Sequence, residues 1–260
     1  MNCTKTIILL LIGLTIMSIY PVHAADSTES WESWNKFFTN TEAWKQTADK
    51  DGIKCYKRPV ETLSSDSFRG IVELDTDLST LIGILMDIEG YAKLFILCSH
   101  IEVTEKVDET SQYLYSYHKI VWPVRTRDSS TFTKWFYDSK TESVWLKLMN
   151  KPDYVPYNKK YVRVPIIAGY FKFTPKPDGK VEAHFEIVAN AGGWIPQWVL
   201  NYYIPYVPYG TLKKLQKMIS KEKYQGFRFN YKEKFATLKI YDNHKFTSEN
   251  QILKLTDLLP

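Results

Sequence analysis

The sequence predicts an α+β fold, in which a curved antiparallel β-sheet wraps around a long helix near the C-terminal end and encloses a hydrophobic cavity. Three observations lead to this expectation. Successive β segments fill residues 99–190, at least one of them carries apolar side chains on both faces, and an aromatic segment followed by an amphipathic helix occupies residues 192–219. A segment as aromatic as the last one needs apolar surface beneath it, so we expect it to form a lid over the cavity.

The first 24 residues are expected to be a signal peptide. Lys5 is followed by a short apolar stretch, and Val22-His23-Ala24 supplies small residues at its exit. An uncleaved membrane anchor is the alternative, but it needs about 20 apolar residues, and polar residues and Pro21 interrupt this run. We therefore expect secretion across the inner membrane and a periplasmic location. The formal charge of the whole chain is only +5, which gives no indication of nucleic-acid binding.

The N-terminal half of the remaining chain alternates between helix and strand patterns. Aromatic residues at helical spacing predict a first helix over 30–38, and strands are expected at 53–60 and 68–74 around a turn at 64–66. Asp77 is placed to cap a helix that carries Leu78, Leu81, Ile82 and Leu85 on one face, with Gly90 as its end. One helical turn is expected at 91–95.

Residues 99–190 read as strands separated by turn sequences, so neighbouring strands should pair in antiparallel fashion. One strand is informative, because Tyr113, Tyr115 and Tyr117 share one face while Leu114, Ser116, His118 and Ile120 share the other. The expected strands are 100–107, 112–121, 129–137, 143–149, 161–164, 169–174 and 180–189.

The predicted lid begins at Gly192-Gly193 and continues as an aromatic helix over 195–203. Pro205 and Pro208 then separate it from a final helix over 212–219. These glycines and prolines are either hinges that let the aromatic helix move or static turns and kinks, and the sequence favours neither.

Two cysteines remain after removal of the signal peptide, Cys55 and Cys98. A disulfide between them would close a loop of roughly 44 residues and contribute about 3 to 4 kcal/mol. The alternative, which we favour, is a pair of buried thiols that pack as small apolar side chains.

Three motifs resemble the START lipid-transfer domains of the helix-grip (Bet v 1-like) superfamily, in particular their secreted bacterial members. They are Tyr91-Ala92-Lys93-Leu94-Phe95 before Cys98, Trp122-Pro123-Val124 before Arg127-Asp128, and Gly192-Gly193-Trp194-Ile195-Pro196 before Asn201, Pro205, Thr211 and Leu212. The resemblance covers about residues 29–222 and leaves 223–260 as a C-terminal extension of unassigned role. After the Arg-Asp pair the family pattern is usually Phe-Val, where this chain has Ser129 and Ser130.

The resemblance implies a non-enzymatic protein that binds one lipid or other hydrophobic small molecule in a tunnel, as a monomer and with no cofactor. Arg127, Asp128 and Arg163 match family positions, either as a structural ion pair that pins the sheet, which we favour, or as head-group ligands. His118 is either a satisfied core histidine or a ligand contact. Trp145, Phe171, Phe173 and Phe185 either line the tunnel or belong to the plain core. The residues assigned to the ligand site are Arg127, Asp128, His118, Trp145, Arg163, Phe171, Phe185, Trp194, Trp198 and Tyr202.

Two other functions stay open. The chain has no nucleophile-elbow, phosphate-loop or zinc-site motif, and its histidines do not fall at helical metal-ligand spacing, so no metal site is expected. An enzyme of the aromatase/cyclase type would have to use His118 or His184. A surface interaction module would use its aromatic helix to bind a partner.

Trp194, Trp198 and Tyr202 would also suit transient contact with a membrane surface, aided by the lysines that follow.

Overall fold

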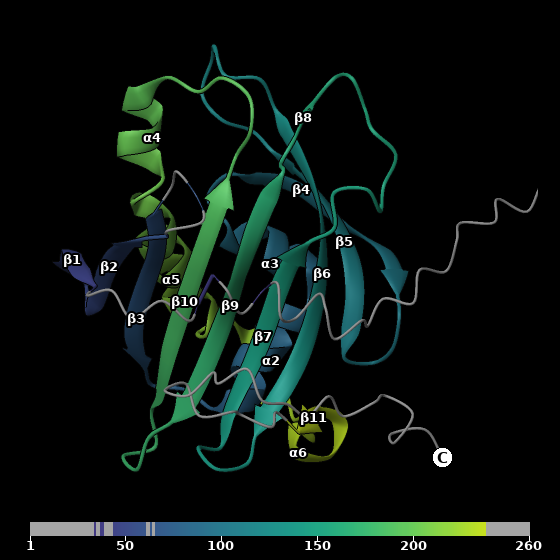
Figure 1. Ribbon diagram of the computed structural model, residues 1–260. Helices are drawn as coiled ribbons and strands as arrows, with labels where there is room; N and C mark the ends of the chain where they lie inside the picture. Colours follow the sequence, from purple (N-terminus) through teal and green to yellow (C-terminus); the bar gives the residue numbers. More distant parts are fainter. Residues whose placement is uncertain (1–33, 35–36, 39–43, 61–62, 64–65, 238–260) are drawn as a thin grey trace, which may run out of the picture.

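The computed structural model describes residues 34, 37–38, 44–60, 63 and 66–237 (Figure 1). The predicted signal peptide, most of the predicted first helix, most of the turn at 64–66 and the end of the C-terminal extension lie outside these residues. None of the helices described is long and apolar enough to cross a membrane.

A single curved sheet forms the body of the protein and confirms the predicted α+β fold (Figure 1). Its strand order is β1-β2-β3-β10-β9-β7-β6-β5-β4 with antiparallel pairing throughout, while the short strands β8 and β11 pair with β6 in parallel. The strands are β1 (Lys45–Lys50), β2 (Ile53–Pro59), β3 (Asp66–Leu74), β4 (Cys98–Lys106), β5 (Ser111–His118), β6 (Arg127–Asp138), β7 (Ser143–Asn150), β8 (Val162–Arg163), β9 (Ile166–Pro175), β10 (Val181–Asn190) and β11 (Ala236–Thr237).

The helices differ from the predicted ones mainly at their ends. Asp77 caps α2 as expected, because its Oδ1 accepts a hydrogen bond of 2.8 Å from the amide of Thr80. Gly90 does not end that helix: α2 stops at Met86, and Gly90 lies inside α3. The helical elements are α2 (Leu78–Met86), α3 (Ile88–Leu94), α4 (Gln197–Tyr203), α5 (Tyr206–Met218), the 3-10 helix η1 (Glu222–Tyr224) and α6 (Tyr231–Lys234).

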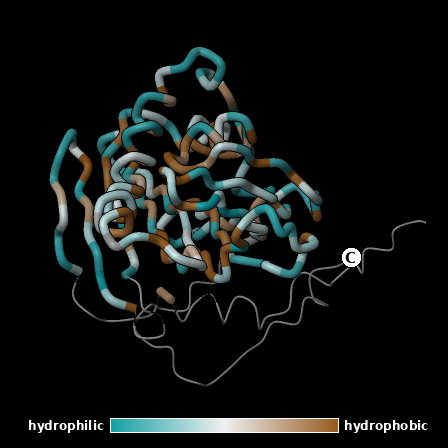
Figure 2. Tube along the Cα trace, turned by 90° about the horizontal axis from the view of Figure 1, so that it is seen from above, coloured by the Kyte–Doolittle hydropathy of each residue, from teal (hydrophilic) through white to brown (hydrophobic). Residues whose placement is uncertain are grey.

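The sheet has a buried core on each face, and β5 contributes Leu114 to one core and Tyr113 to the other. On the inner face, α2, α3 and α5 pack against apolar side chains of the central strands, which include Phe171, Phe173 and Phe185. On the outer face, Trp34 and Phe37 cover a second cluster with Tyr113 and Tyr170. Seen from above, apolar residues lie mainly inside the molecule and hydrophilic ones predominate on its outer loops (Figure 2).

Helix α5 crosses the inner face of the sheet and contacts β3 at very short range. It begins at Tyr206 rather than at Leu212. Pro208 is tolerated in the first turn of the helix, because a backbone N–H at that position would have no acceptor within the helix. A Cβ atom at Gly70 would lie 2.7 Å from Leu212 Cδ1 and 3.1 Å from Pro208 Cβ. The absence of a side chain at Gly70 therefore sets how closely the helix approaches the sheet.

The described part of the C-terminal extension packs on the domain. Tyr224 and Phe235 belong to the inner core, and the ring of Phe235 stacks on Trp135 with centroids 5.1 Å apart. Strand β11 then adds to the sheet beside β6. Residues 223–237 are thus part of the folded unit.

Replacement of Gly70 by alanine should lower the free energy of unfolding by about 1–3 kcal/mol, because the new methyl group overlaps Leu212. Chemical denaturation of the variant measures the loss. The double variant Gly70→Ala/Leu212→Val removes the overlapping carbon, so its loss should be smaller than the sum of the two single losses. Additive losses would show that this contact does not limit helix packing.

Candidate ligand-binding site

A cavity of about 150 Å³ lies between the inner face of the sheet and the helices. The loop after α3 and the start of β4 form one wall, the ends of β5, β6, β9 and β10 form the floor, and the junction between α4 and α5 closes the top. Most of its lining is aliphatic or aromatic, including Phe95, Ile101, Leu148, Ile187, Ile204 and Val207. Such a lining favours an apolar ligand.

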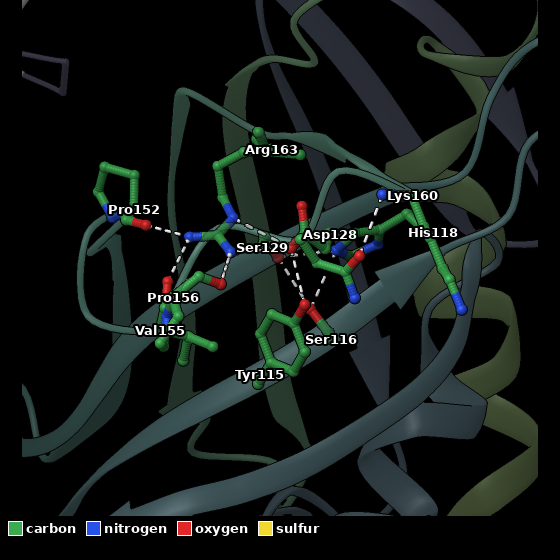
Figure 3. A network of polar contacts seen from close by, with 12 residues as sticks. Tyr115, Ser116, His118, Asp128, Ser129, Pro152, Val155, Pro156, Lys160 and Arg163 are labelled. Atoms are coloured by element: carbon green, nitrogen blue, oxygen red, sulfur yellow. Dashed lines mark hydrogen bonds and ion pairs between the residues drawn. The ribbon is translucent and has the colours of Figure 1, made fainter.

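One patch of the cavity wall is polar and is built by two neighbouring strands. In the antiparallel pairing of β5 with β6, His118 lies opposite Arg127 and Ser116 lies opposite Ser129. All four side chains line the cavity. Ser129 Oγ lies 2.8 Å from both Ser116 Oγ and His118 Nε2, and the last two atoms are 3.0 Å apart (Figure 3).

Burial strongly affects the imidazole of His118. Loss of solvation lowers its pKa to about 4, although the charge of Asp128 acts in the opposite direction. His118 is therefore neutral at pH 7 and contributes one donor and one acceptor to the wall. Among the described residues, no group of three or more His, Cys, Asp or Glu side chains is placed to hold a metal ion.

Arg127 is 1% exposed and contacts carbonyl groups. Its guanidinium donates to the carbonyl of Arg125 and, over 3.3 and 3.1 Å, to those of Gly192 and Trp194. Its Nε has no hydrogen-bond partner among the residues that the structure describes. Burial, together with the charge of Arg125, lowers the pKa of this guanidinium below its ordinary value. Arg127 thus connects the floor of the cavity to the segment that leads into α4.

Asp128 and Arg163 form an ion pair on the opposite face of the sheet. Arg163 Nη2 lies 2.9 Å from Asp128 Oδ2, which also accepts a 2.7 Å hydrogen bond from the hydroxyl of Tyr115 (Figure 3). The same guanidinium donates to the carbonyls of Pro152, Val155 and Pro156. The sequence analysis favoured an ion pair for the Arg127-Asp128 motif; in the structure the ion pair joins Asp128 to Arg163 instead, and Arg127 bonds to carbonyls.

Three other predicted ligand residues do not line the cavity. Trp145 lies on the outer face with Tyr170, at a centroid distance of 5.0 Å. Phe171 and Phe185 are fully buried in the inner core and stack at 4.6 Å behind Phe95, which does line the cavity. We therefore leave Asp128, Arg163, Trp145, Phe171 and Phe185 out of the site proposed below.

The aromatic residues of the lid are exposed rather than buried against the cavity. Trp194 is 71%, Trp198 55% and Tyr202 72% exposed. Both glycines before them adopt left-handed backbone angles, with φ of 65° at Gly192 and 60° at Gly193. Ile204 and Val207, on either side of Pro205, are the lid residues that contact the cavity.

The sequence analysis missed most of the lining. Ser116 shares the face of His118 in the alternating pattern, and Ser129 is a departure from the family motif, so both signals were present. Ile187 and Ile101 gave no signal, because their strands meet the cavity only through long-range pairing.

Cys98 also lines the cavity, and both Cys55 and Cys98 are free thiols on strands near opposite edges of the sheet.

The fold and cavity define a protein class with an internal site for an apolar ligand, and comparison with known proteins assigns the family. A model of the START domain matches residues 29–220. An uncharacterized protein of Pseudomonas aeruginosa is 30% identical over 182 residues, which cover 69% of this chain and 88% of that protein. The chain belongs to the START domain family.

Solved structures agree with this assignment. A STAR-related lipid transfer protein fragment from Xanthomonas axonopodis is similar with a TM-score of 0.63 and 28% identity, covering 69% of this chain and all of that one. Human STARD10 has a TM-score of 0.62 at 16% identity over 85% of this chain and 95% of its own, which shows the shared fold. Family membership thus indicates that the cavity holds a lipid or another hydrophobic ligand.

The depressed pKa of His118 makes stability depend on pH. In the unfolded chain this imidazole titrates near its ordinary pKa of 6.5, and in the folded protein at about 4. The unfolded state therefore binds more protons between these values, so the free energy of unfolding should fall by up to about 3 kcal/mol as the pH drops from about 6.5 to 4.

Denaturation curves across this pH range measure the effect. In a His118→Gln variant the free energy of unfolding should depend less steeply on pH. Burial also lowers the pKa of His184, but this residue contributes equally to both proteins. His100→Gln, at an exposed position, controls for the loss of one imidazole. An unchanged slope in His118→Gln would contradict the burial of a neutral His118.

Proposed function

We propose that this protein is a non-enzymatic lipid-binding protein that holds one hydrophobic ligand in the cavity beneath the α4–α5 lid and carries it through the periplasm as a monomer. The observation that carries the proposal is the cavity itself. It is partly open and largely apolar, and the junction between two helices, rather than a continuous element, covers it.

The size of the cavity supports a lid that opens. Pockets for drug-sized ligands have volumes of about 300–1,000 Å³, and this cavity measures about 150 Å³. A lipid chain therefore needs outward movement of part of the wall. Pro205 interrupts the helical path between Ile204 and Val207, so α4 can move away while the buried part of α5 keeps its contacts with β3.

The chemistry of the wall supports a binding role over the enzymatic alternative. General acid–base catalysis works best with a pKa near the operating pH, and burial lowers the pKa of His118 to about 4. His184, the other candidate, belongs to the outer face, where its Nε2 lies 2.8 Å from Glu182 Oε1. An aromatase/cyclase-type reaction would thus lack a well-matched base in this cavity.

One end of the molecule is suited to membrane contact during ligand exchange. Trp122, in the loop between β5 and β6, is 87% exposed. Arg125 of the same loop donates to the carbonyls of Lys159 and Lys160 and so joins two basic loops at the end where α4 lies (Figure 1). Exposed tryptophans beside basic side chains favour the interface of an anionic bilayer.

The lysines of α5 contribute less to such a surface than the sequence suggested. Lys213 pairs with Asp51 at 3.0 Å, and Lys214 donates to the carbonyl of Phe95 over 3.3 Å. Lys213 is thus paired with a carboxylate, and the hydrogen bond of Lys214 draws its ammonium group toward the protein. The basic groups available at the lid end are those of the two loops, Lys119, Arg125, Lys159 and Lys160.

Native mass spectrometry of the mature protein from its own periplasm, followed by extraction, tests the proposal directly. We expect one hydrophobic molecule per protein chain. A protein that arrives empty and binds none of a panel of labelled lipids would overturn the carrier function. Turnover of a hydrophobic substrate that is lost in His118→Gln would establish the enzyme instead.

A substitution at the lid should block binding without unfolding the protein. Val207→Trp places a bulky ring at the mouth of the cavity and should weaken lipid binding at least tenfold, as measured by displacement of a fluorescent lipid. The matched control is Val103→Trp on β4, at an exposed position outside the cavity. Equal affinities of the two variants would place the ligand elsewhere.

Membrane contact has its own test. Trp122→Ser and Trp198→Ser should each weaken partitioning onto vesicles of mixed zwitterionic and anionic lipids roughly three- to tenfold, because each removes an exposed apolar side chain from the interface. Vesicle sedimentation measures the change. Val107→Ser, an exposed apolar position at the opposite end of the sheet, is the control. An equal loss in Val107→Ser would refute docking through the lid end.

A further inference from the structure

The wall of the cavity contains a positive charge without a counterion. Arg127 is buried, lines the cavity and bonds only to backbone carbonyls. Among the described residues, no carboxylate lies within ion-pair distance of it, since the adjacent Asp128 points to the outer face and pairs with Arg163. A buried cation in this state is costly, and an anion in the cavity would lower that cost.

A hydroxyl donor lies beside that charge on the same face of β6. Arg127 and Ser129 are two residues apart, so both side chains point into the cavity. When neutral His118 carries its proton on Nε2, it donates to Ser129 Oγ, and Ser116 can donate to the same oxygen. The proton of Ser129 is then available to a ligand oxygen.

The remainder of the cavity accepts only apolar groups. Beyond the polar patch the wall consists of side chains such as Phe95, Ile101, Ile187 and Val207. A ligand that satisfies both regions has a small polar head and a hydrocarbon body. It is an amphiphile held with its head toward β5 and β6 and its body toward the lid.

We propose that the ligand is a single-chain carboxylic acid bound as its carboxylate, with one oxygen facing the guanidinium of Arg127 and the other accepting from Ser129. This assignment rests on the proposed lipid-binding function and specifies the class of lipid. A carboxylate matches the donors present, because three of the four Nη hydrogens of Arg127 already bond to carbonyls and Nε has no partner among the described residues. A phosphate, with more oxygens and more charge to desolvate, needs more donors than this wall offers.

Three probes with one hydrocarbon chain separate the head group from the body: lauric acid, lauryl alcohol and methyl laurate. Titration calorimetry of the mature, delipidated protein should show that lauric acid binds at least tenfold more tightly than either neutral probe. Comparable binding of all three would overturn the carboxylate assignment and leave the lipid-binding function intact. Failure of all three, and of longer-chain and phospholipid probes, would overturn both.

The variants use two adjacent serines on opposite faces of β6. Ser129→Ala should weaken lauric acid about tenfold and methyl laurate by less, because an ester carbonyl accepts a weaker hydrogen bond than a carboxylate. Ser130→Ala, on the outer face and away from the cavity, should leave both affinities unchanged. Arg127→Gln should remove the preference for the acid, with circular dichroism and thermal unfolding to establish that it folds. A preference that survives both Ser129→Ala and Arg127→Gln would refute the site.

Discussion

The buried ion pair between Asp128 and Arg163 holds the end of the sheet on which the cavity is built. Both side chains are 1% exposed, and Tyr115 hydrogen-bonds to the same carboxylate oxygen. Removing one partner of such a pair costs about 3–5 kcal/mol, because it leaves the other charge buried and uncompensated. The guanidinium also bonds to carbonyls of the loop before β8, so the ion pair fixes both the strand and the loop beside it.

The same constraint organises the opposite face. Since side chains alternate along a strand, a fixed Asp128 on the outer face places Arg127 and Ser129 on the inner face, inside the cavity. Arg127 then bonds to the carbonyls of Gly192 and Trp194, where the chain turns toward α4. Scaffold, polar patch and lid are thus connected through three consecutive residues of β6.

Much of the fold could be predicted because it depends on local patterns. Residues close together in the sequence determine three features of the fold. They are the split of β5 into a tyrosine face and a face with His118, the cap at Asp77, and the order of the elements. The polar edge strand β1 was missed, since it lacks the apolar alternation that marks a strand. The return of β10 to the side of β3 is a long-range pairing that no local pattern encodes.

The site was harder to predict than the fold, for a physical reason. A one-residue difference along β6 decides whether a side chain meets the ligand or the outer core, and sequence similarity to a motif does not state which face a residue occupies. Arg127 and Asp128 were therefore assigned together, although the sheet separates them. Trp145 was assigned by its size and aromatic character, and its strand directs it outward.

The measurement that tests this account most directly is a crystal structure of the protein purified with its natural ligand. The account predicts elongated density in the cavity, with one end beside Arg127 and Ser129 and the other beneath Ile204 and Val207. An empty cavity, with the ligand instead in the second hollow formed by Asp77, Lys176 and Arg228 between α2, the β9–β10 hairpin and the C-terminal extension, would contradict it.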